Sequence, residues 1–286
     1  MDQLAAPVPV PTRLRLAHGV LELIARRAEA SILHVKGVAL HEDLAAGRMP
    51  SSDCDVLVRP DRVDALCEAL ESANWHQLTH FSHGSVFAHA ATFHHAVWGT
   101  VDVHRSFPGL DLDPEATFQR FWTDRTTTEL GGIDCPVPTL QHQRLLLLVH
   151  AARDAFVRPT HDVDVSWTRL NPSERDHLDA LAQELGATVP LALVTARPER
   201  ARGGRQVHLW TALHDRRDAR RIRLAMLRDV SSPREAWALA RAVSQVNPDH
   251  LALRLGRPPT REELRREWWA RFPRWILPRN SRRHHR

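Results

Sequence analysis

The chain has 286 residues, with 39 lysine and arginine residues against 34 acidic ones, so its formal net charge is +5 and anionic partners such as nucleotides, nucleic acid or acidic lipid are favoured. No apolar run approaches the roughly 20 residues that a membrane-spanning helix needs, and the first residues lack the basic and apolar blocks of a signal peptide. The three cysteines form no CxxC pair, which argues against a disulfide framework or a thiolate zinc site and favours a reducing cytoplasm.

Strand and helix patterns alternate in the first half of the chain. Residues 1–12 contain three prolines and are predicted to be a flexible lead. Residues 13–30 have the apolar spacing of a helix, and the run 32–35 is typical of a buried strand that stops at a glycine turn. The elements expected next are a short helix over 38–46, a strand over 53–58, a helix with Asp61 as its N-cap, and two or three strands between 76 and 104, the last over 96–104.

The pattern changes after residue 140, beyond which only helices are predicted. They are expected over 145–156, from Asn171-Pro-Ser-Glu onward with Asn171 or Ser173 as the cap, and over 188–197, 218–229, 233–246 and 260–270. The fold class is therefore α+β (α/β), with a small mixed sheet followed by a helical half, and the seam is placed at 131–138. The expected division is a lead over 1–12, an α/β domain over 13–138, a helical domain over 139–260 and a basic, tryptophan-rich segment over 261–286.

Acidic residues on two predicted strands point to a metal site. Asp53 and Asp55 stand two apart, and successive strand side chains point to opposite faces, so both acids share one face. Asp102 and His104 share a face of the later strand for the same reason. If the two strands pair, three carboxylates converge, and such oxygen ligands suit Mg²⁺, which also bridges triphosphate oxygens.

Each motif is weak alone, since an Asp-x-Asp pair recurs at Asp162 and Asp164, but their order is more specific. The chain resembles the uncharacterised bacterial nucleotidyltransferase family of the DNA polymerase β type over about residues 15–165. The motifs that carry the resemblance are Lys36-Gly37, Arg48-Met-Pro-Ser-Ser52, Asp53-Cys-Asp-Val56, Val101-Asp-Val-His104 and the apolar helix Leu145–Ala152.

The resemblance implies a catalytic domain over 13–138 that uses a nucleoside triphosphate. Asp53 and Asp55 would bind two Mg²⁺ ions, with Mn²⁺ as the alternative metal. Asp102 would complete the metal site and could act as base toward the acceptor. The chain departs from the wider superfamily where Lys36-Gly37 replaces the usual Gly-Ser.

Lys36 is the single lysine among 38 arginines. Either it survives by chance in an arginine-rich composition, or the position needs a compact ammonium beside the β- and γ-phosphates rather than a guanidinium fork. Gly37 would let the backbone approach a phosphate, and Ser52 would donate to a phosphate or cap a turn.

Three further residues are candidates for substrate contact. His104 would contact substrate or orient Asp102. Arg158 and Asp162 would reach the nucleotide from the second half, with a salt bridge at a helix end as the alternative. The histidines between 76 and 95 match no zinc pattern and are predicted to be structural or at the surface.

The acceptor is not readable from the sequence: RNA, a protein and a natural product are all open, as are the nucleobase and the oligomeric state. The alternatives to an enzyme are a catalytically silent nucleotide-binding module and a basic RNA- or membrane-binding protein. The second alternative rests on residues 261–286, where tryptophans interleave with arginines. Docking of those tryptophans on the protein's own surface is the competing explanation.

Overall fold

The computed structural model describes residues 8–81, 89–153, 160–215, 217–244 and 246–276. Its centre is a mixed five-stranded sheet in the order β1-β2-β5-β4-β3, in which β2 and β5 are parallel and the other neighbours antiparallel. The mixed α+β class predicted from the sequence is confirmed. The strands are β1 (Ile32–Val35), β2 (Cys54–Val58), β3 (His76–Gln77), β4 (Ala90–His95) and β5 (Gly99–His104).

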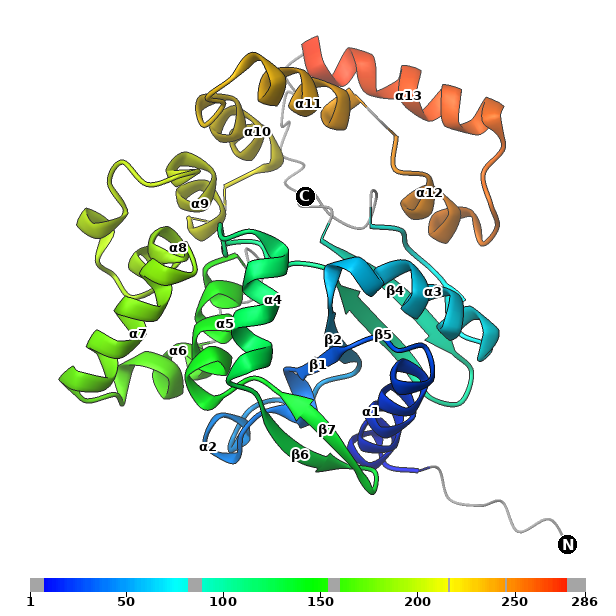
Figure 1. The fold of residues 1–286 in the computed structure, drawn as a ribbon. Coiled ribbons are helices and arrows are strands. Elements are labelled where there is room, and N and C mark those ends of the chain that lie inside the picture. The colour runs from blue at the N-terminus through cyan, green and yellow to red at the C-terminus, as the bar shows by residue number, and fades with distance from the viewer. Residues whose placement is uncertain (1–7, 82–88, 154–159, 216, 245, 277–286) are drawn as a thin grey trace, which may run out of the picture.

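Helices cover both faces of this sheet (Figure 1). On one face α1 (Val10–Arg27) and α3 (Val63–Ser72) pack against Val56 of β2 and Val103 of β5. On the other face Leu57 of β2 joins a core built largely from the helices that follow the sheet. Side chains alternate along a strand, so Asp55, Asp102 and His104 are directed to this second face.

The helices after the sheet form one layer with that second core. Asn171, one of the two residues predicted as cap, caps α7: its side chain accepts from the Glu174 amide at 2.9 Å, and the Glu174 carboxylate accepts from the Asn171 amide at 2.9 Å. The helices of this layer are α4 (Pro114–Thr123), α5 (Leu140–Arg153), α6 (Thr160–Val163), a π-helical turn (Asp164–Thr168), α7 (Pro172–Glu184), α8 (Thr188–Val194), the 3-10 turn η4 (Pro198–Ala201) and α9 (Val207–His214).

Residues 131–138, predicted as the seam, form the turn and second strand of a hairpin, β6 (Thr126–Leu130) and β7 (Ile133–Val137). The hairpin packs against α1 at Gly19, where a Cβ would lie 2.7 Å from the Leu130 carbonyl oxygen. Gly131 and Gly132 both have positive φ, the turn conformation that closes a tight hairpin. The chain thus folds back on α1 at the predicted seam. The predicted domain limits of 13–138 and 139–260 stay predictions.

Local boundaries differ from the predictions in other places too. α1 begins at Val10, so the expected lead is shorter among the described residues. The region predicted as one helix over 38–46 divides into a 3-10 turn, η1 (Gly37–Ala39), and α2 (Glu42–Ala45). The N-cap assignment of Asp61 is wrong, because Pro60 starts a 3-10 turn, η2 (Pro60–Arg62), and α3 follows without a side-chain cap.

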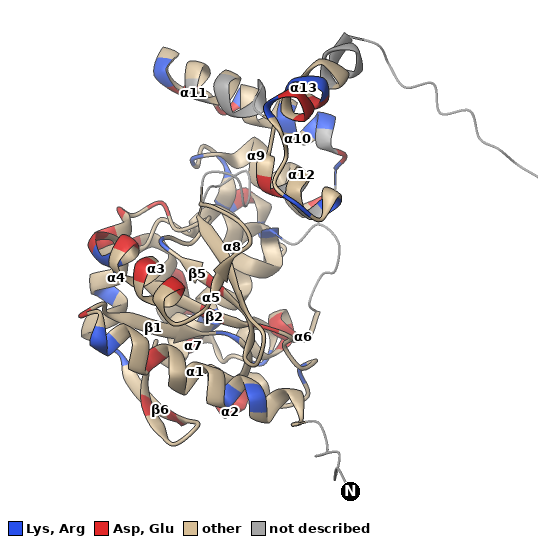
Figure 2. Ribbon diagram, turned by 90° about the vertical axis from the view of Figure 1, so that its right-hand side faces the viewer, with Lys and Arg blue, Asp and Glu red and all other residues tan. Residues whose placement is uncertain are grey.

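Four helices at the C-terminal end form a separate arch (Figure 1): α10 (Ala219–Arg228), α11 (Pro233–Ser244), α12 (Pro248–Leu255) and α13 (Arg261–Ile276). Asp249 of α12 ties the arch to the sheet domain by accepting from the His80 amide at 2.7 Å. Trp237 and Trp269 are 65% and 62% exposed, so docking buries neither of them. Arginines of α10 and α13 lie along this arch (Figure 2).

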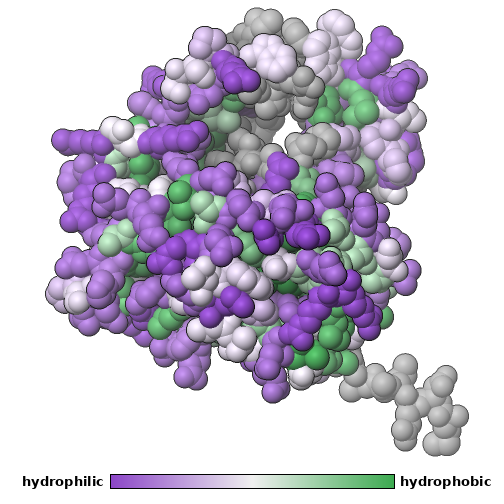
Figure 3. Space-filling model, viewed as in Figure 1, coloured by the Kyte–Doolittle hydropathy of each residue, from purple (hydrophilic) through white to green (hydrophobic). Residues whose placement is uncertain are grey.

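Apolar side chains gather in no broad area on the face shown in Figure 3, which is mainly hydrophilic. Of the helices in the described part of the chain, none combines the length and the apolar character needed to cross a membrane.

Candidate active site

The pairing of β2 with β5 brings two acidic residues side by side. The two strands run parallel with Asp55 opposite Asp102, as the sequence argument required. Asp55, Asp102 and His104 each offer one ligand atom, and these atoms lie within 4.8 Å of one another. Asp53 lies just before β2 and lines the same cavity but is not a member of this trio.

Asp55 is a buried carboxylate held by two donors on one oxygen. Lys36 Nζ and His104 Nε2 each lie 2.8 Å from its Oδ1. Burial alone would raise the pKa of Asp55, but the Lys36 charge and the hydrogen bond from His104 outweigh it and lower the pKa well below its usual value. Asp55 is therefore ionised at neutral pH.

Asp102 has the opposite electrostatic character. Burial raises its pKa, and the nearby charges of Asp55 and Asp53 raise it further, although the Thr92 hydroxyl donates to Asp102 Oδ1 at 2.7 Å. Burial lowers the pKa of His104, so its imidazole is neutral and donates through Nε2 to Asp55. The ionised form is therefore stabilised at Asp55 on β2, whereas the protonated form is favoured at Asp102 on β5.

The chain leaves β1 in a conformation that is rare outside glycine. Lys36 has φ 58° and ψ −172°, and Gly37 follows with φ 51°. An L-residue in this region costs about 1–3 kcal/mol and is found mainly at functional sites. Gly37 is closely packed, since a Cβ there would lie 3.1 Å from Ser51 Cβ. The strained turn directs Lys36 toward Asp55.

These groups line a cavity of about 390 Å³. Lys36, Gly37 and Ser51 line it together with the three acids. His89, which precedes β4, and His150 and Arg153 from the end of α5 also line it. Arg153 lies 3.0 Å from His89 Nε2, and burial, assisted by the Arg153 charge, lowers the pKa of His89 to about 2.

Residues 14–201 match the family described as "Uncharacterised nucleotidyltransferase". This chain belongs to that family. A solved structure of the lincosamide antibiotic adenylyltransferase LnuA bound to lincomycin is also similar, with 17% identity, a TM-score of 0.36, and coverage of 51% of this chain and 91% of that one. No curated protein matches the chain.

The donor set of this nucleotidyltransferase fits a divalent metal. Two carboxylates and a neutral imidazole lie within coordinating reach of one another. The like charges that raise the pKa of Asp102 are a cost that a cation between Asp102 and Asp55 would remove. Asp53 stands beside them and could contribute a further oxygen.

The loop over 48–52 of the nucleotidyltransferase is fixed at both ends. Arg48 donates through Nε and an Nη to the two carboxylate oxygens of Asp162, at 2.9 and 3.2 Å. Ser51 donates to the carbonyl oxygen of Asp53 at 3.0 Å and to its Oδ1 at 2.8 Å. Ser52, the predicted phosphate contact, is exposed and does not line the cavity. The preceding residue, Ser51, does line the cavity, and a phosphate contact at Ser52 stays a prediction.

Asp162 and Arg158 were predicted to reach the nucleotide from the second half. Asp162 is 1% exposed, and Arg48 donates to both its carboxylate oxygens. Asp162 does not line the cavity itself and is connected to it only through Arg48, which does. Arg158 lies outside the described residues. His104 lines the cavity beside Asp55, as expected from its position on β5.

Several residues that line the cavity were not among the predicted site residues. His89, predicted to be structural or at the surface, is buried, with its ring centroid 5.5 Å from that of His104. Thr92 also escaped notice, but its place on β4 two residues from Ala90 puts it on the acid-bearing face. His150 and Arg153 end an apolar helix, and polar residues there were the available signal.

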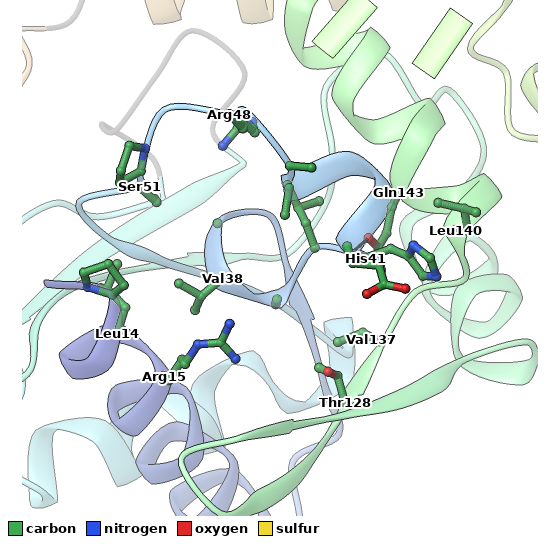
Figure 4. A pocket seen from close by; sticks show the side chains of 18 of the residues that line it. Leu14, Arg15, Val38, His41, Arg48, Ser51, Thr128, Val137, Leu140 and Gln143 are labelled. Atoms are coloured by element: carbon green, nitrogen blue, oxygen red, sulfur yellow. Dashed lines mark hydrogen bonds between the residues drawn. The ribbon is translucent and has the colours of Figure 1, made fainter. Parts of the chain in front are cut away.

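A second cavity of about 720 Å³ adjoins the first and shares Gly37, Arg48 and Ser51 with it (Figure 4). Val38 and Leu140 supply apolar surface there, and Arg15 and Thr128 supply polar groups. Its volume is in the range of small-molecule sites.

Proposed function

We propose that this chain transfers a nucleoside monophosphate from a nucleoside triphosphate to a hydroxyl acceptor, with Mg²⁺ or Mn²⁺ held by Asp53, Asp55 and Asp102. The observation that carries the proposal is the opposition of Asp55 and Asp102 on parallel strands, beside a lysine on a strained turn. Membership of a nucleotidyltransferase family supports the same chemistry.

The side chains divide the work by their charge states. Asp55 stays ionised and holds cations, and His104 orients it through the 2.8 Å hydrogen bond. Asp102, which accepts a hydrogen bond from Thr92 and lies opposite Asp55, is the carboxylate that would take the proton of the acceptor. Gly37 and Ser51 offer a close backbone approach and a hydroxyl to the phosphates. The divalent ions, when bound, neutralise charge on the attacking and leaving oxygens.

The reaction is an in-line displacement at the α-phosphorus. The acceptor hydroxyl oxygen forms a bond to that phosphorus, and the bond to the oxygen that bridges the α- and β-phosphates breaks. Pyrophosphate leaves, and the hydroxyl proton passes to Asp102. The side chains of the cavity mainly position the reactants and compensate their charge.

A catalytically silent module is disfavoured, because every acid of the predicted set lines the cavity. The acceptor class, whether RNA, protein or natural product, stays open. The LnuA structure is bound to the antibiotic lincomycin, but that likeness is too weak to choose among acceptors.

Pyrophosphate release tests the proposal. The full chain is incubated with each of the four common nucleoside triphosphates, Mg²⁺ or Mn²⁺, and separate RNA, protein and small-molecule fractions of a cell extract. We expect release with at least one combination and its loss in Asp102→Asn. Folded protein, verified by circular dichroism, that releases no pyrophosphate in any combination contradicts the proposal.

A further inference from the structure

In the ligand-free protein, the Lys36 ammonium supplies the positive charge that the buried carboxylate of Asp55 requires. This ammonium is 2.8 Å from Asp55 Oδ1, and that carboxylate also belongs to the trio of possible metal ligands. The Lys36 side chain is only 13% exposed, and that of Asp55 is 8% exposed. The lysine therefore neutralises the carboxylate that a divalent ion would have to use.

The backbone shows that this lysine is held at a cost. Position 36 has a conformation that glycine adopts freely and other residues adopt at about 1–3 kcal/mol. Chance retention of a lysine does not explain why a long side chain occupies a turn suited to glycine. The ammonium contact with Asp55 does explain it.

The chemistry of lysine suits a contact that can be exchanged. Its ammonium is a compact point charge on a flexible four-carbon stem, whereas arginine presents a rigid fork. Arg48, the next arginine along the chain after Lys36, already uses its fork on both oxygens of Asp162. Lys36 lies next to Gly37 and Ser51, so a short movement of its stem would carry the charge from the carboxylate to a phosphate.

Resting on the proposed function, we propose that Lys36 is an exchangeable counter-ion: it holds Asp55 in the free protein and passes to the triphosphate when metal and nucleotide bind together. A metal ion alone must compete with the ammonium for Asp55. A metal ion that arrives with a triphosphate offers the ammonium a new anionic partner. Lys36 thus makes the binding of metal and triphosphate cooperative.

Lys36→Met removes the charge, keeps the length of the side chain and gives two effects of opposite sign. We expect the Kd of Mn²⁺ for the free full-length chain, measured by electron paramagnetic resonance, to fall about tenfold. We expect the Kd of inorganic tripolyphosphate at saturating Mn²⁺, measured by calorimetry, to rise about tenfold. Tenfold corresponds to about 1.4 kcal/mol, within the range of one charge-assisted hydrogen bond. Tripolyphosphate makes the test independent of the nucleobase.

Arg27→Met is the matched control, because exposed Arg27 lines neither cavity and its loss changes the net charge equally. Both constants should stay within about twofold of the parent values in this variant. Unchanged or weaker Mn²⁺ binding in Lys36→Met overturns the exchange, whatever happens to tripolyphosphate. Asp55→Asn separates the metal site of the proposed function from the exchange by Lys36. If this variant binds Mn²⁺ as the parent does, the metal site itself is misplaced. If it loses Mn²⁺ binding, the proposed function stands even when the Lys36→Met results overturn the exchange.

Discussion

Two Asp-x-Asp pairs in this chain are nearly identical in sequence but lie in different structural surroundings. Asp53 and Asp55 flank the start of a strand and both line the cavity. Asp162 and Asp164 lie where α6 passes into a π-helical turn, and there Asp162 is buried on Arg48 while the side chain of Asp164 is 41% exposed and pairs with Arg169. A spacing of two gives one face on a strand and divergent directions on a helix. The chemistry of the motif is set by the element that carries it.

The largest expected difference between the two pairs is catalytic. Asp55→Asn should reduce nucleotidyl transfer by about 10³-fold or more, because several kcal/mol of charge stabilisation depend on that carboxylate. Asp164→Asn should leave the rate within about twofold. Pyrophosphate release at saturating triphosphate compares them, and equal rates in the two variants would remove the distinction.

The next effect concerns the stability of the second pair. Asp162→Asn leaves Arg48 without its bidentate carboxylate and should lower the free energy of unfolding by about 2–3 kcal/mol, less than a fully buried pair because the Arg48 side chain is 21% exposed. Asp164→Asn, at the exposed pair, should change it by less than about 0.5 kcal/mol. Urea unfolding measures both changes. A loss below 0.5 kcal/mol for Asp162→Asn would show that the ion pair between Arg48 and Asp162 does not stabilise the fold.

A smaller effect sharpens the contrast between the two strand acids. The pKa of Asp102 is raised in the fold, so its ionised form destabilises the metal-free chain above that pKa. Asp102→Asn should therefore stabilise the metal-free chain on the order of 1 kcal/mol at pH 7, since Asn can still accept from Thr92. The gain should shrink as pH falls toward the usual carboxyl pKa. Thermal melts with chelator at pH 7 and pH 4 test it, and a gain that grows on acidification contradicts the assignment.

The smallest effect isolates the strain at the end of β1. Lys36→Gly and Lys36→Met both lose the ammonium, but only glycine relaxes the backbone. Glycine removes the backbone strain but also increases the conformational entropy of the unfolded chain, which offsets part of the gain. The net result should be a glycine variant about 1 kcal/mol more stable than the methionine variant. Chemical denaturation of the two variants decides it: if the methionine variant is the more stable, position 36 is not strained.

Strand periodicity allowed the acids of the site to be predicted, because a spacing of two leaves one choice of face once β2 and β5 pair. In the loop before β2, Ser51 rather than Ser52 lines the cavity, and the sequence did not indicate this because loop residues have no periodicity that fixes direction. His89 and Arg153 meet at 3.0 Å although 64 positions separate them in the sequence. Such a contact is set by tertiary packing and leaves no local pattern.

Turn chemistry explains the other differences. Gly131 and Gly132 close a hairpin within the predicted seam, whose role as a domain limit stays a prediction, and Pro60 starts a 3-10 turn where the sequence predicts Asp61 as a helix cap. The left-handed backbone of Lys36 could not be read from composition, although the uniqueness of that lysine pointed to the position.

The central claim is that Asp55 and Asp102 support transfer of the α-phosphoryl group with its nucleoside. Parallel reactions with triphosphates labelled on the α- or the γ-phosphate test it directly, using the wild-type chain, Mg²⁺ or Mn²⁺ and extract acceptors. We predict that the acceptor retains α-label, that γ-label appears only in pyrophosphate, and that Asp55→Asn abolishes both signals. Transfer of γ-label to the acceptor, or α-label transfer that survives in Asp55→Asn, would contradict the account.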